Sequence, residues 1–268
     1  MMLVNGRPAE TIDARDRGLA YGDGVFRTLR VEAGEPLWWR DHAAKLAADC
    51  AALALACPDP QALLAEVNAV AGQGDCVVKL IVTRGTGARG YAPPEGPVTR
   101  IVMAAPVPAH GLPGAPTDIA ARTCTLRLAR QPRLAGVKHL NRLENVLARA
   151  EWRDPEIFEG LLCDDTGMLV GGTMSNLLWM KDGELRTPDQ SASGVAGVAL
   201  ARLLRAAPRL GIPARFERQP PAAILDADEI MICNSLIGVR RVAQLDGTVL
   251  PDAGWRARLN DALYENLD

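Results

Sequence analysis

LAGVKHLNRLENVLARAEW, residues 134–152, places one lysine after a loop and directly before an amphipathic stretch that predicts a helix over residues 140–153. A lysine that forms a Schiff base must be held rigidly and partly desolvated. Lys138 is flanked by apolar Val137 and Leu140, which suits that role. On composition and spacing alone, a surface charge beside a helix start is the commoner explanation.

Lysine is rare in this chain, which makes each one a candidate for amine chemistry. Of the 30 basic residues only four are lysines, Lys45, Lys79, Lys138 and Lys181. Lys181 is expected at a solvated hairpin tip, Lys79 within an apolar strand, and Lys45 on the polar side of a helix. Lys138 is therefore the best candidate of the four.

The chain is long enough for two domains, and its pattern predicts two of the α+β class. It has 268 residues, 48% of them hydrophobic and 23% charged. The prolines and glycines of PVPAHGLPGAP, residues 106–116, are typical of a linker. We predict an N-terminal domain over residues 1–108, a linker over 109–117 and a C-terminal domain over 118–268.

Hydrophobic periodicity predicts the elements of both domains. In the first domain we expect strands over residues 25–31, 37–39, 75–84 and 99–105, and helices over 42–55 (with Asp41 as N-cap) and 61–71. In the second we expect strands over 118–128, 160–164, 168–179 and 229–233, helices over 140–153 and 195–210, and a terminal helix after Pro251.

Several function classes are disfavoured by composition. The net charge of −2 gives no basic excess for nucleic acid, and no apolar run reaches the roughly 18 residues of a membrane span. The N-terminus has no secretory pattern, so we expect a cytoplasmic protein. The six cysteines form no C-x-x-C pair and the three histidines no ligand motif, so no metal is expected. GTGARG, residues 85–90, matches the G-x-G-x-x-G pattern of dinucleotide-binding sites. The YAPP that follows cannot begin the helix that such a site requires, so we expect an anion-binding loop instead.

Seven blocks along nearly the whole chain resemble the fold-type IV family of pyridoxal-phosphate (PLP) enzymes, in the family's order and spacing. They are RGLAYGDGVF (17–26), HAAKL (42–46), TRGTGARGY (83–91), LAGVKHLNRLENVLAR (134–149), GGTMSNLLW (171–179), SGVAGVAL (193–200) and EIMICNSLIGV (229–239). The resemblance implies two domains, each a mixed sheet or barrel with helices, and an active site at the domain interface. It also implies a homodimer.

The resemblance implies that Lys138 carries PLP as a Schiff base. It further implies that Val195 and Ala196 at a helix start, Ser235 and Lys45 bind the phosphate. A phosphate dianion suits a helix N-terminus completed by a hydroxyl and a cation.

Substrate recognition is implied for the loop that matches TRGTGARGY, which in D-amino-acid transaminases reaches the partner's site. The matching positions are Arg89 and Tyr91, and an arginine fork suits a carboxylate. Three residues depart from the family pattern. Lys45 replaces the usual arginine, and Arg27 replaces an acidic residue or threonine and is expected to hold a substrate carboxylate. Gly171 replaces the glutamate that pairs with the cofactor's ring nitrogen.

GVKHLNRLE is typical of the family's lyase branch, so the implied reaction is 4-amino-4-deoxychorismate to 4-aminobenzoate and pyruvate. One alternative is a fold-type IV aminotransferase acting on D-amino or branched-chain amino acids. Another is a homologue that binds PLP but is catalytically impaired, because Arg27 and Gly171 both depart from the pattern.

Overall fold

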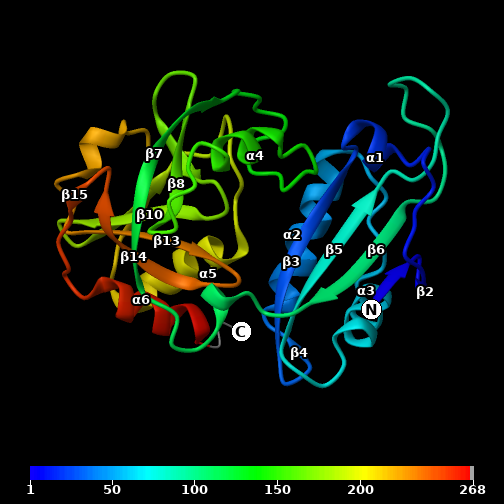
Figure 1. Cartoon of the computed structure of the whole chain (residues 1–268), viewed down its shortest axis with the longest axis horizontal. Coiled ribbons are helices and arrows are strands. Elements are labelled where there is room, and N and C mark those ends of the chain that lie inside the picture. Colours follow the sequence, from blue (N-terminus) through cyan, green and yellow to red (C-terminus); the bar gives the residue numbers. More distant parts are fainter. Residues whose placement is uncertain (266–268) are drawn as a thin grey trace. The chain divides into compact units, whose positions relative to one another are not determined.

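Two groups of strands, each with its own helices, make up the chain (Figure 1). The computed structural model describes residues 1–265. Unit 1 comprises Met1–Leu112 and the short segment Val137–Asn141. Unit 2 comprises Pro113–Gly136 and the chain from Arg142 onward. The short segment carries Lys138 and thus belongs to unit 1, although it lies inside the predicted C-terminal domain.

Unit 1 contains an antiparallel six-stranded sheet in the order β2-β1-β6-β5-β3-β4. Its elements are β1 (Met2–Val4), β2 (Arg7–Pro8), α1 (Arg17–Tyr21), β3 (Gly24–Glu32), β4 (Glu35–Pro36), α2 (Trp39–Ala52), α3 (Pro60–Ala71), β5 (Cys76–Thr83), β6 (Thr99–Ala105) and a short 3₁₀ helix (Ala109–Gly111).

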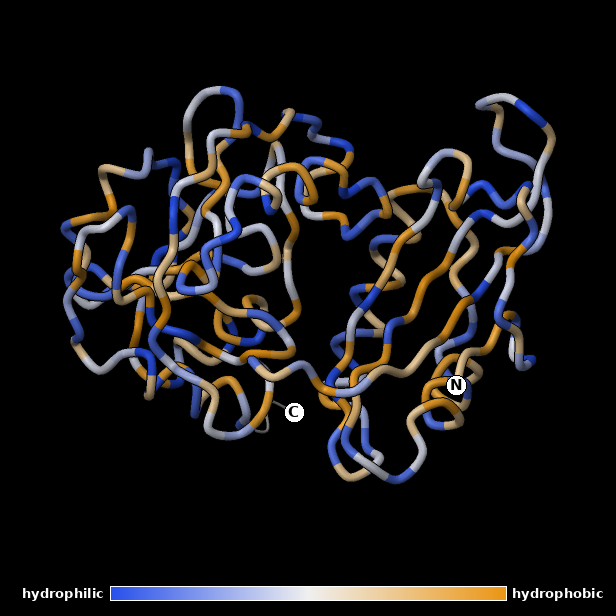
Figure 2. The backbone as a smooth tube through the Cα atoms, in the orientation of Figure 1, coloured by the Kyte–Doolittle hydropathy of each residue, from blue (hydrophilic) through white to orange (hydrophobic). Residues whose placement is uncertain are grey.

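The core of unit 1 forms where helices α2 and α3 cover one face of this sheet. Val25, Leu29 and Val31 alternate along β3 and are fully buried, as the period of two predicts. They share a core cluster with Leu46 of α2 and Leu63 of α3. Hydrophobic colours follow the central strands of this sheet in Figure 2.

Unit 2 contains a mixed sheet in the order β12-β11-β10-β13-β14-β7-β8-β9, with β15 paired to β14. The pairs β11–β12, β14–β7 and β7–β8 are parallel. Its strands are β7 (Asp118–Leu128), β8 (Ile157–Asp164), β9 (Leu169–Gly172), β10 (Asn176–Lys181), β11 (Glu184–Pro188), β12 (Ala214–Glu217), β13 (Glu229–Asn234), β14 (Gly238–Leu245) and β15 (Thr248–Val249). Its helices are α4 (Leu143–Arg149), α5 (Val198–Ala206) and α6 (Trp255–Tyr264), with 3₁₀ turns at Ala207–Leu210 and Pro221–Ile224.

Two predicted strands and one predicted N-cap differ from the structure. The predicted strand over 37–39 is replaced by the start of α2, which begins at Trp39 after Trp38 adopts a left-handed conformation. Asp41 therefore lies in the first turn instead of capping it. The predicted strand over 168–179 is two strands, β9 and β10, separated by a turn at residues 173–175.

Two predicted helices begin later than expected. The predicted helix over 140–153 is shortened to α4, because residues 138–140 pair with β3. The predicted helix over 195–210 begins at Val198, and its last turn is the 3₁₀ helix Ala207–Leu210. Within residues 1–265, none of the helices has the length and apolar character needed to cross a membrane.

Candidate functional site

Lys138 is held by a short strand-like segment that pairs with the edge of β3. The Phe26 N–H donates to the Lys138 carbonyl at 3.0 Å, and the Leu140 N–H donates to the Gly24 carbonyl at 2.9 Å. A Cβ atom at Gly24 would lie 2.8 Å from the Leu140 side chain and 2.5 Å from the Val82 carbonyl. Glycine at position 24 thus allows the lysine-bearing segment to approach, and both flanks of Lys138 are fixed.

The side chain and the backbone of Lys138 have different neighbours. The Nζ atom lies 4.6 Å from the centroid of the Phe26 ring. The Lys138 backbone N–H donates to Oδ2 of Asp49, at 3.1 Å. An amine above an aromatic ring is partly shielded from water, as a Schiff-base lysine requires.

Asp49 also binds two cations that the sequence singled out. Its carboxylate forms ion pairs with Arg27 of β3 and with Lys45, one turn earlier on α2. The side chain of Arg27 is 2% exposed and that of Asp49 is 1% exposed. Burial lowers the pKa of Arg27 to about 10. Burial and then the charge of Arg27 lower the pKa of Lys45 to about 8.

Arg27 contacts the carboxylate of Asp49 in this structure. The prediction that Arg27 binds a substrate carboxylate stays untested. Asp49 was not found from the sequence, because its pairing with Arg27 joins residues of two separate elements. Its spacing of four from Lys45 on a helix is the signal that could have found it.

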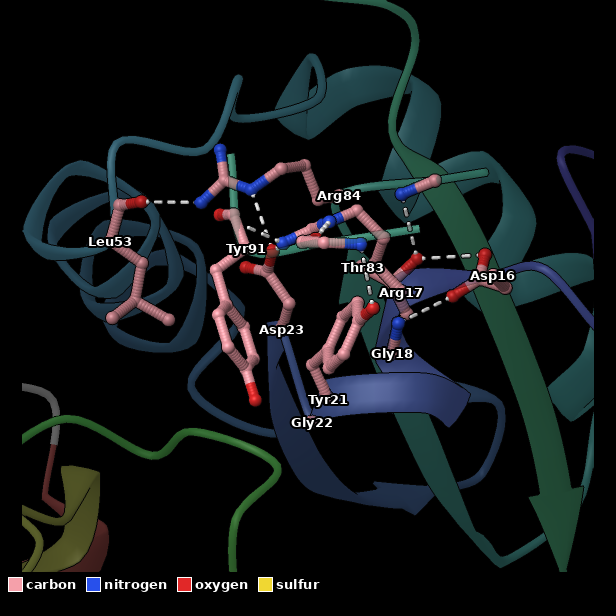
Figure 3. Close-up of polar contacts among 12 residues, drawn as sticks. Asp16, Arg17, Gly18, Tyr21, Gly22, Asp23, Leu53, Thr83, Arg84 and Tyr91 are labelled. Carbon is pink, nitrogen blue, oxygen red and sulfur yellow. Dashed lines mark hydrogen bonds and ion pairs between the residues drawn. The ribbon is translucent and has the colours of Figure 1, made fainter. Parts of the chain in front are cut away.

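The loop at residues 84–98 is anchored at both its start and its tip by α1 and the residues that follow it (Figure 3). Nε of Arg17 and Nε of Arg84 both reach Oδ2 of Asp23, at 2.9 and 2.8 Å. Arg17 also donates from Nη1 to the Gly90 carbonyl at 2.8 Å. Burial alone would raise the pKa of Asp23, but hydrogen bonds from Arg84 and Arg17 lower it below its usual value.

Two further sets of contacts complete this clamp. The other nitrogens of Arg84 donate to the carbonyls of Leu53 and Ala54, at 2.8 and 2.9 Å. The Gly90 N–H donates to the Tyr21 hydroxyl at 3.1 Å, and the Tyr21 and Tyr91 ring centroids are 5.5 Å apart. The tip of the loop is therefore held, although Tyr91 is 86% exposed.

The predicted substrate residues lie beside this anchored point. Arg89 and Tyr91 flank Gly90 and are both exposed. Both side chains are therefore accessible to a ligand or another chain, while the backbone between them is fixed by Arg17 and Tyr21.

In unit 2 the start of α5 is fixed by backbone bonds that involve the predicted phosphate residues. The Ala196 N–H donates to the Gly136 carbonyl at 3.1 Å, and the Gly136 N–H to the Gly194 carbonyl at 3.0 Å. The Asn176 amide donates to the Val195 carbonyl at 2.8 Å. No side chain of the described residues caps the first turn of α5. That turn, beginning after Gly197, is a suitable anion site.

Ser235 lies in the turn between β13 and β14. Oδ1 of Asn234 accepts from the N–H groups of Leu236 and Ile237, at 2.8 and 3.0 Å, which orders this turn. The Asn234 amide donates to the Met174 carbonyl at 3.2 Å. The Ser235 turn and the turn at 173–175 are therefore neighbours.

Glu159 is a second residue that sequence reasoning missed. Its fully buried carboxylate accepts from the Thr173 and Ser175 hydroxyls, at 2.5 and 2.7 Å, and from the N–H groups of Gly160, Thr173 and Met174. It thereby fixes the turn that follows Gly171. A Cβ atom at Gly171 would meet one atom, the Ser175 carbonyl oxygen at 3.2 Å.

The structure thus brings Lys138, Lys45 and Arg27 together around Asp49 within unit 1. It places Arg89 and Tyr91 on the clamped loop of the same unit. Val195, Ala196 and Ser235 lie in unit 2, at neighbouring strand ends and the start of α5.

Comparison with known proteins gives concordant results. The amino-transferase class IV family matches residues 24–245. A solved structure of 4-amino-4-deoxychorismate lyase from Pseudomonas aeruginosa is 46% identical, with a TM-score of 0.91 and 100% of both chains covered.

Two curated proteins extend this comparison. Aminodeoxychorismate lyase of Vibrio harveyi is 35% identical over 91% of this chain and 90% of its own length. A putative branched-chain-amino-acid aminotransferase of Methanocaldococcus jannaschii is 30% identical over 93% of this chain and 89% of its own length. The predicted α+β fold of fold-type IV is confirmed, and the chain belongs to the amino-transferase class IV family.

Proposed function

We propose that this chain is a PLP-dependent lyase that converts 4-amino-4-deoxychorismate to 4-aminobenzoate and pyruvate. The observation that carries the proposal is Lys138, an amine with its backbone fixed on both sides, in a chain similar over 91% and 100% of its length to two proteins named as this lyase. The similarity to proteins named as aminotransferases is lower, at 30% identity or less among those compared.

The residues present fit PLP. The aldehyde requires a partly shielded amine, which Lys138 supplies beside Phe26. A phosphate dianion requires N–H donors, a hydroxyl and a cation. The uncapped first turn of α5 offers N–H donors, Ser235 offers a hydroxyl and Lys45 offers a cation. We propose that together they hold the cofactor, with Val195 and Ala196 shaping the phosphate site through the bonds that fix the start of α5.

When bound, PLP would supply electron withdrawal from the carbon that bears the substrate's amine. The Lys138 amine would take the proton from that ring carbon, acting as general base at its Nζ atom. The electron pair left behind would expel the enolpyruvyl oxygen from the adjacent ring carbon. The ring becomes aromatic, and enolpyruvate takes up a proton to give pyruvate.

The substrate has two carboxylates, and the clamped loop offers groups to bind one of them. We propose that Arg89 and Tyr91 bind a substrate carboxylate. An arginine fork suits such a group, and the clamp lowers the entropic cost of ordering the loop. The resemblance implies that this loop acts on the partner's site, so we also propose a homodimer. A cytoplasmic location likewise stays a prediction.

The test is production of 4-aminobenzoate and pyruvate by the parent protein and by Lys138→Ala. We expect the substitution to lower kcat by roughly three orders of magnitude or more, because it removes both the cofactor attachment and the base. Lys79→Ala is the matched control, since its amine also lies near the Phe26 ring, at 5.3 Å, but on an exposed strand position.

Two outcomes would contradict the proposal. One is equal activity of Lys138→Ala and Lys79→Ala. The other is a parent protein that does not form 4-aminobenzoate but converts bound PLP to pyridoxamine phosphate when given an amino acid, which would identify an aminotransferase.

A further inference from the structure

Glu159, on β8, has a charged side chain in the interior of unit 2 and forms no ion pair with any of the residues 1–265. A buried carboxylate is costly unless its oxygens are paired or hydrogen-bonded. Glu159 meets this requirement with hydrogen bonds alone. Four of its five donors, two N–H groups and two hydroxyls, belong to the turn at residues 173–175.

The turn at residues 173–175 closes tightly on this carboxylate. The Gly172 N–H donates to the Ser175 carbonyl at 2.8 Å. A Cβ atom at Gly172 would lie 2.7 Å from Oε2 of Glu159 and 2.4 Å from the Ser175 hydroxyl oxygen. Only glycine at position 172 lets the chain pass this close, so the sequence and the buried carboxylate together determine where the turn lies.

One side chain connects this turn to the turn that carries Ser235. The Asn234 amide donates to the Met174 carbonyl at 3.2 Å. At the other end of the same amide group, Oδ1 of Asn234 accepts from the N–H groups of the two residues that follow Ser235. A displacement of the turn held by Glu159 would therefore also displace the backbone around Ser235.

The residue that follows the turn contacts the start of α5. Asn176 is the first residue of β10, and its amide donates to the Val195 carbonyl at 2.8 Å. A Cβ atom at Gly197, directly before α5, would lie 2.1 Å from Oδ1 of Asn176. The turn at residues 173–175 is thus joined on one side to the Ser235 turn and on the other to the first turn of α5.

We propose that Glu159 is a positioning residue for the phosphate of PLP. By holding the turn at residues 173–175, its carboxylate positions both the Ser235 turn and the first turn of α5. Position 171, just before this turn, is glycine and offers no side chain to the cofactor. The inference rests on the proposed function, which assigns Ser235 and the start of α5 to the phosphate.

The experiment compares two ligands of the full chain, PLP and pyridoxal, which has a hydroxyl in place of the phosphate ester. Absorbance titration measures the affinity of each for the parent protein and for Glu159→Gln. The glutamine amide places a donor where the carboxylate of Glu159 is surrounded by donors, so the turn is no longer held. We expect PLP to bind about tenfold more weakly, and pyridoxal to bind within about twofold of the parent.

Glu229→Gln is the matched control. Glu229 is also fully buried in unit 2, and its carboxylate accepts from the N–H groups of Ala253, Trp255 and Arg256 at the start of α6. Both substitutions should lower the midpoint of urea unfolding, because each leaves backbone donors facing an amide. Only Glu159→Gln should reduce the preference for PLP over pyridoxal.

The hydroxyl partners test the same claim if Glu159→Gln does not fold. Thr173→Val removes one donor to Glu159 and keeps the carboxylate, so PLP should bind about threefold more weakly. Thr173→Ser retains the hydroxyl and should bind PLP like the parent. In the Glu159→Gln background Thr173→Val should have no further effect, because both changes remove the same hydrogen bond.

An equal loss of affinity for PLP and pyridoxal in Glu159→Gln, or the same loss of preference in Glu229→Gln, would overturn the inference and leave Glu159 as a core stabiliser. An unchanged PLP affinity in both Glu159→Gln and Thr173→Val would overturn it as well. A parent protein that binds PLP but forms no 4-aminobenzoate would contradict the proposed function, while the comparison of the two ligands would still decide the role of Glu159. A parent that binds no PLP would contradict both.

Discussion

Gly171 stands where the resemblance to fold-type IV enzymes implies a glutamate that pairs with the ring nitrogen of PLP. A glutamate there keeps the ring nitrogen of PLP protonated and strengthens electron withdrawal. Glu159 does not offer a free carboxylate in its place, since five donors already surround its two oxygens. We expect the lyase reaction to proceed, more slowly, without this glutamate, because its product ring is aromatic.

Gly171→Glu is therefore expected to raise kcat by about tenfold or more, since each ~1.4 kcal/mol of barrier is a factor of ten. The measurement is the rate of 4-aminobenzoate formation. Gly171→Gln is the control for size, because its Cβ meets the same Ser175 carbonyl at 3.2 Å without adding a charge. Equal turnover of Gly171→Glu and the parent would show that the missing glutamate does not limit this reaction.

At the scale of single residues, the sequence identified Lys138, Lys45 and Arg27 as candidate site residues. It did not identify Asp49, whose carboxylate contacts all three. Lysine scarcity and the motif around position 138 single out the amine. The role of Asp49 depends on the register in which β3 packs against α2, and no local pattern encodes that register. Glu159 was missed for the same reason, because its hydrogen-bond donors include the Thr173 and Ser175 hydroxyls, which lie in the turn between β9 and β10.

At the scale of elements, the clamp on the loop at residues 84–98 has a testable consequence. Arg17→Lys keeps a positive charge near Asp23 but loses the fork that also reaches the Gly90 carbonyl. Such hydrogen bonds contribute about 1 kcal/mol each. We expect cleavage by trypsin after Arg89 to become about fivefold faster and KM for the substrate to rise, with a smaller change in kcat.

Limited proteolysis and steady-state kinetics measure these effects. Arg15→Lys is the control, because Arg15 pairs with Asp13 at an exposed site just before α1. Equal rates of loop cleavage in Arg17→Lys and Arg15→Lys would show that the clamp does not order the loop.

Strands were predicted better than helix starts, for a physical reason. The strands over 99–105 and 118–128 match β6 and β7, because both segments contain β-branched residues and neither glycine nor proline interrupts them. The start of α5 was misplaced because Val195 and Ala196 bond to Asn176 and Gly136, which are distant in sequence. The turn at 173–175 was missed although Gly171 and Gly172 precede it, and its order comes from the distant Glu159.

At the scale of the whole molecule, α4 presents an apolar face to solvent. Leu143, Val146 and Leu147 share one side of this helix and are all exposed. If this face contributes to the proposed homodimer, Leu147→Glu should weaken the dimer by at least tenfold, because it buries an unpaired charge in the interface. Sedimentation velocity at several concentrations measures this. Val249→Glu, at an exposed apolar position on β15, is the control, and an unchanged mass of Leu147→Glu would exclude α4 from a dimer interface.

Alkaline stability is a second property of the whole chain. Burial raises the pKa of the Cys233 thiol to about 12, above its ordinary value of 9.0. At a pH between these two pKa values, the thiol of the unfolded chain has lost a proton that the folded chain keeps. The free energy of unfolding therefore falls by up to about 1.4 kcal/mol for each pH unit of increase. Cys233→Ala lacks this loss.

The destabilisation caused by Cys233→Ala should therefore be largest near pH 8 and shrink as the pH rises above 9. Urea unfolding at pH 8, 9 and 10.5 measures the trend, with Cys57→Ala, at an exposed site, as the control. A constant difference between Cys233→Ala and the parent across this range would contradict the expected linkage.

The segment Val137–Asn141 has a consequence for how such chains can be recombined. Its flanks belong to unit 2, yet its backbone completes the edge of β3 and its first charged residue contacts Asp49. A chimera that joins residues 1–112 of this protein to the remainder of a relative would receive a foreign edge strand and a foreign lysine against its own arginine–aspartate pair. The two halves therefore cannot be exchanged independently, because the backbone of the segment that carries Lys138 must fit against β3 and Asp49 of unit 1.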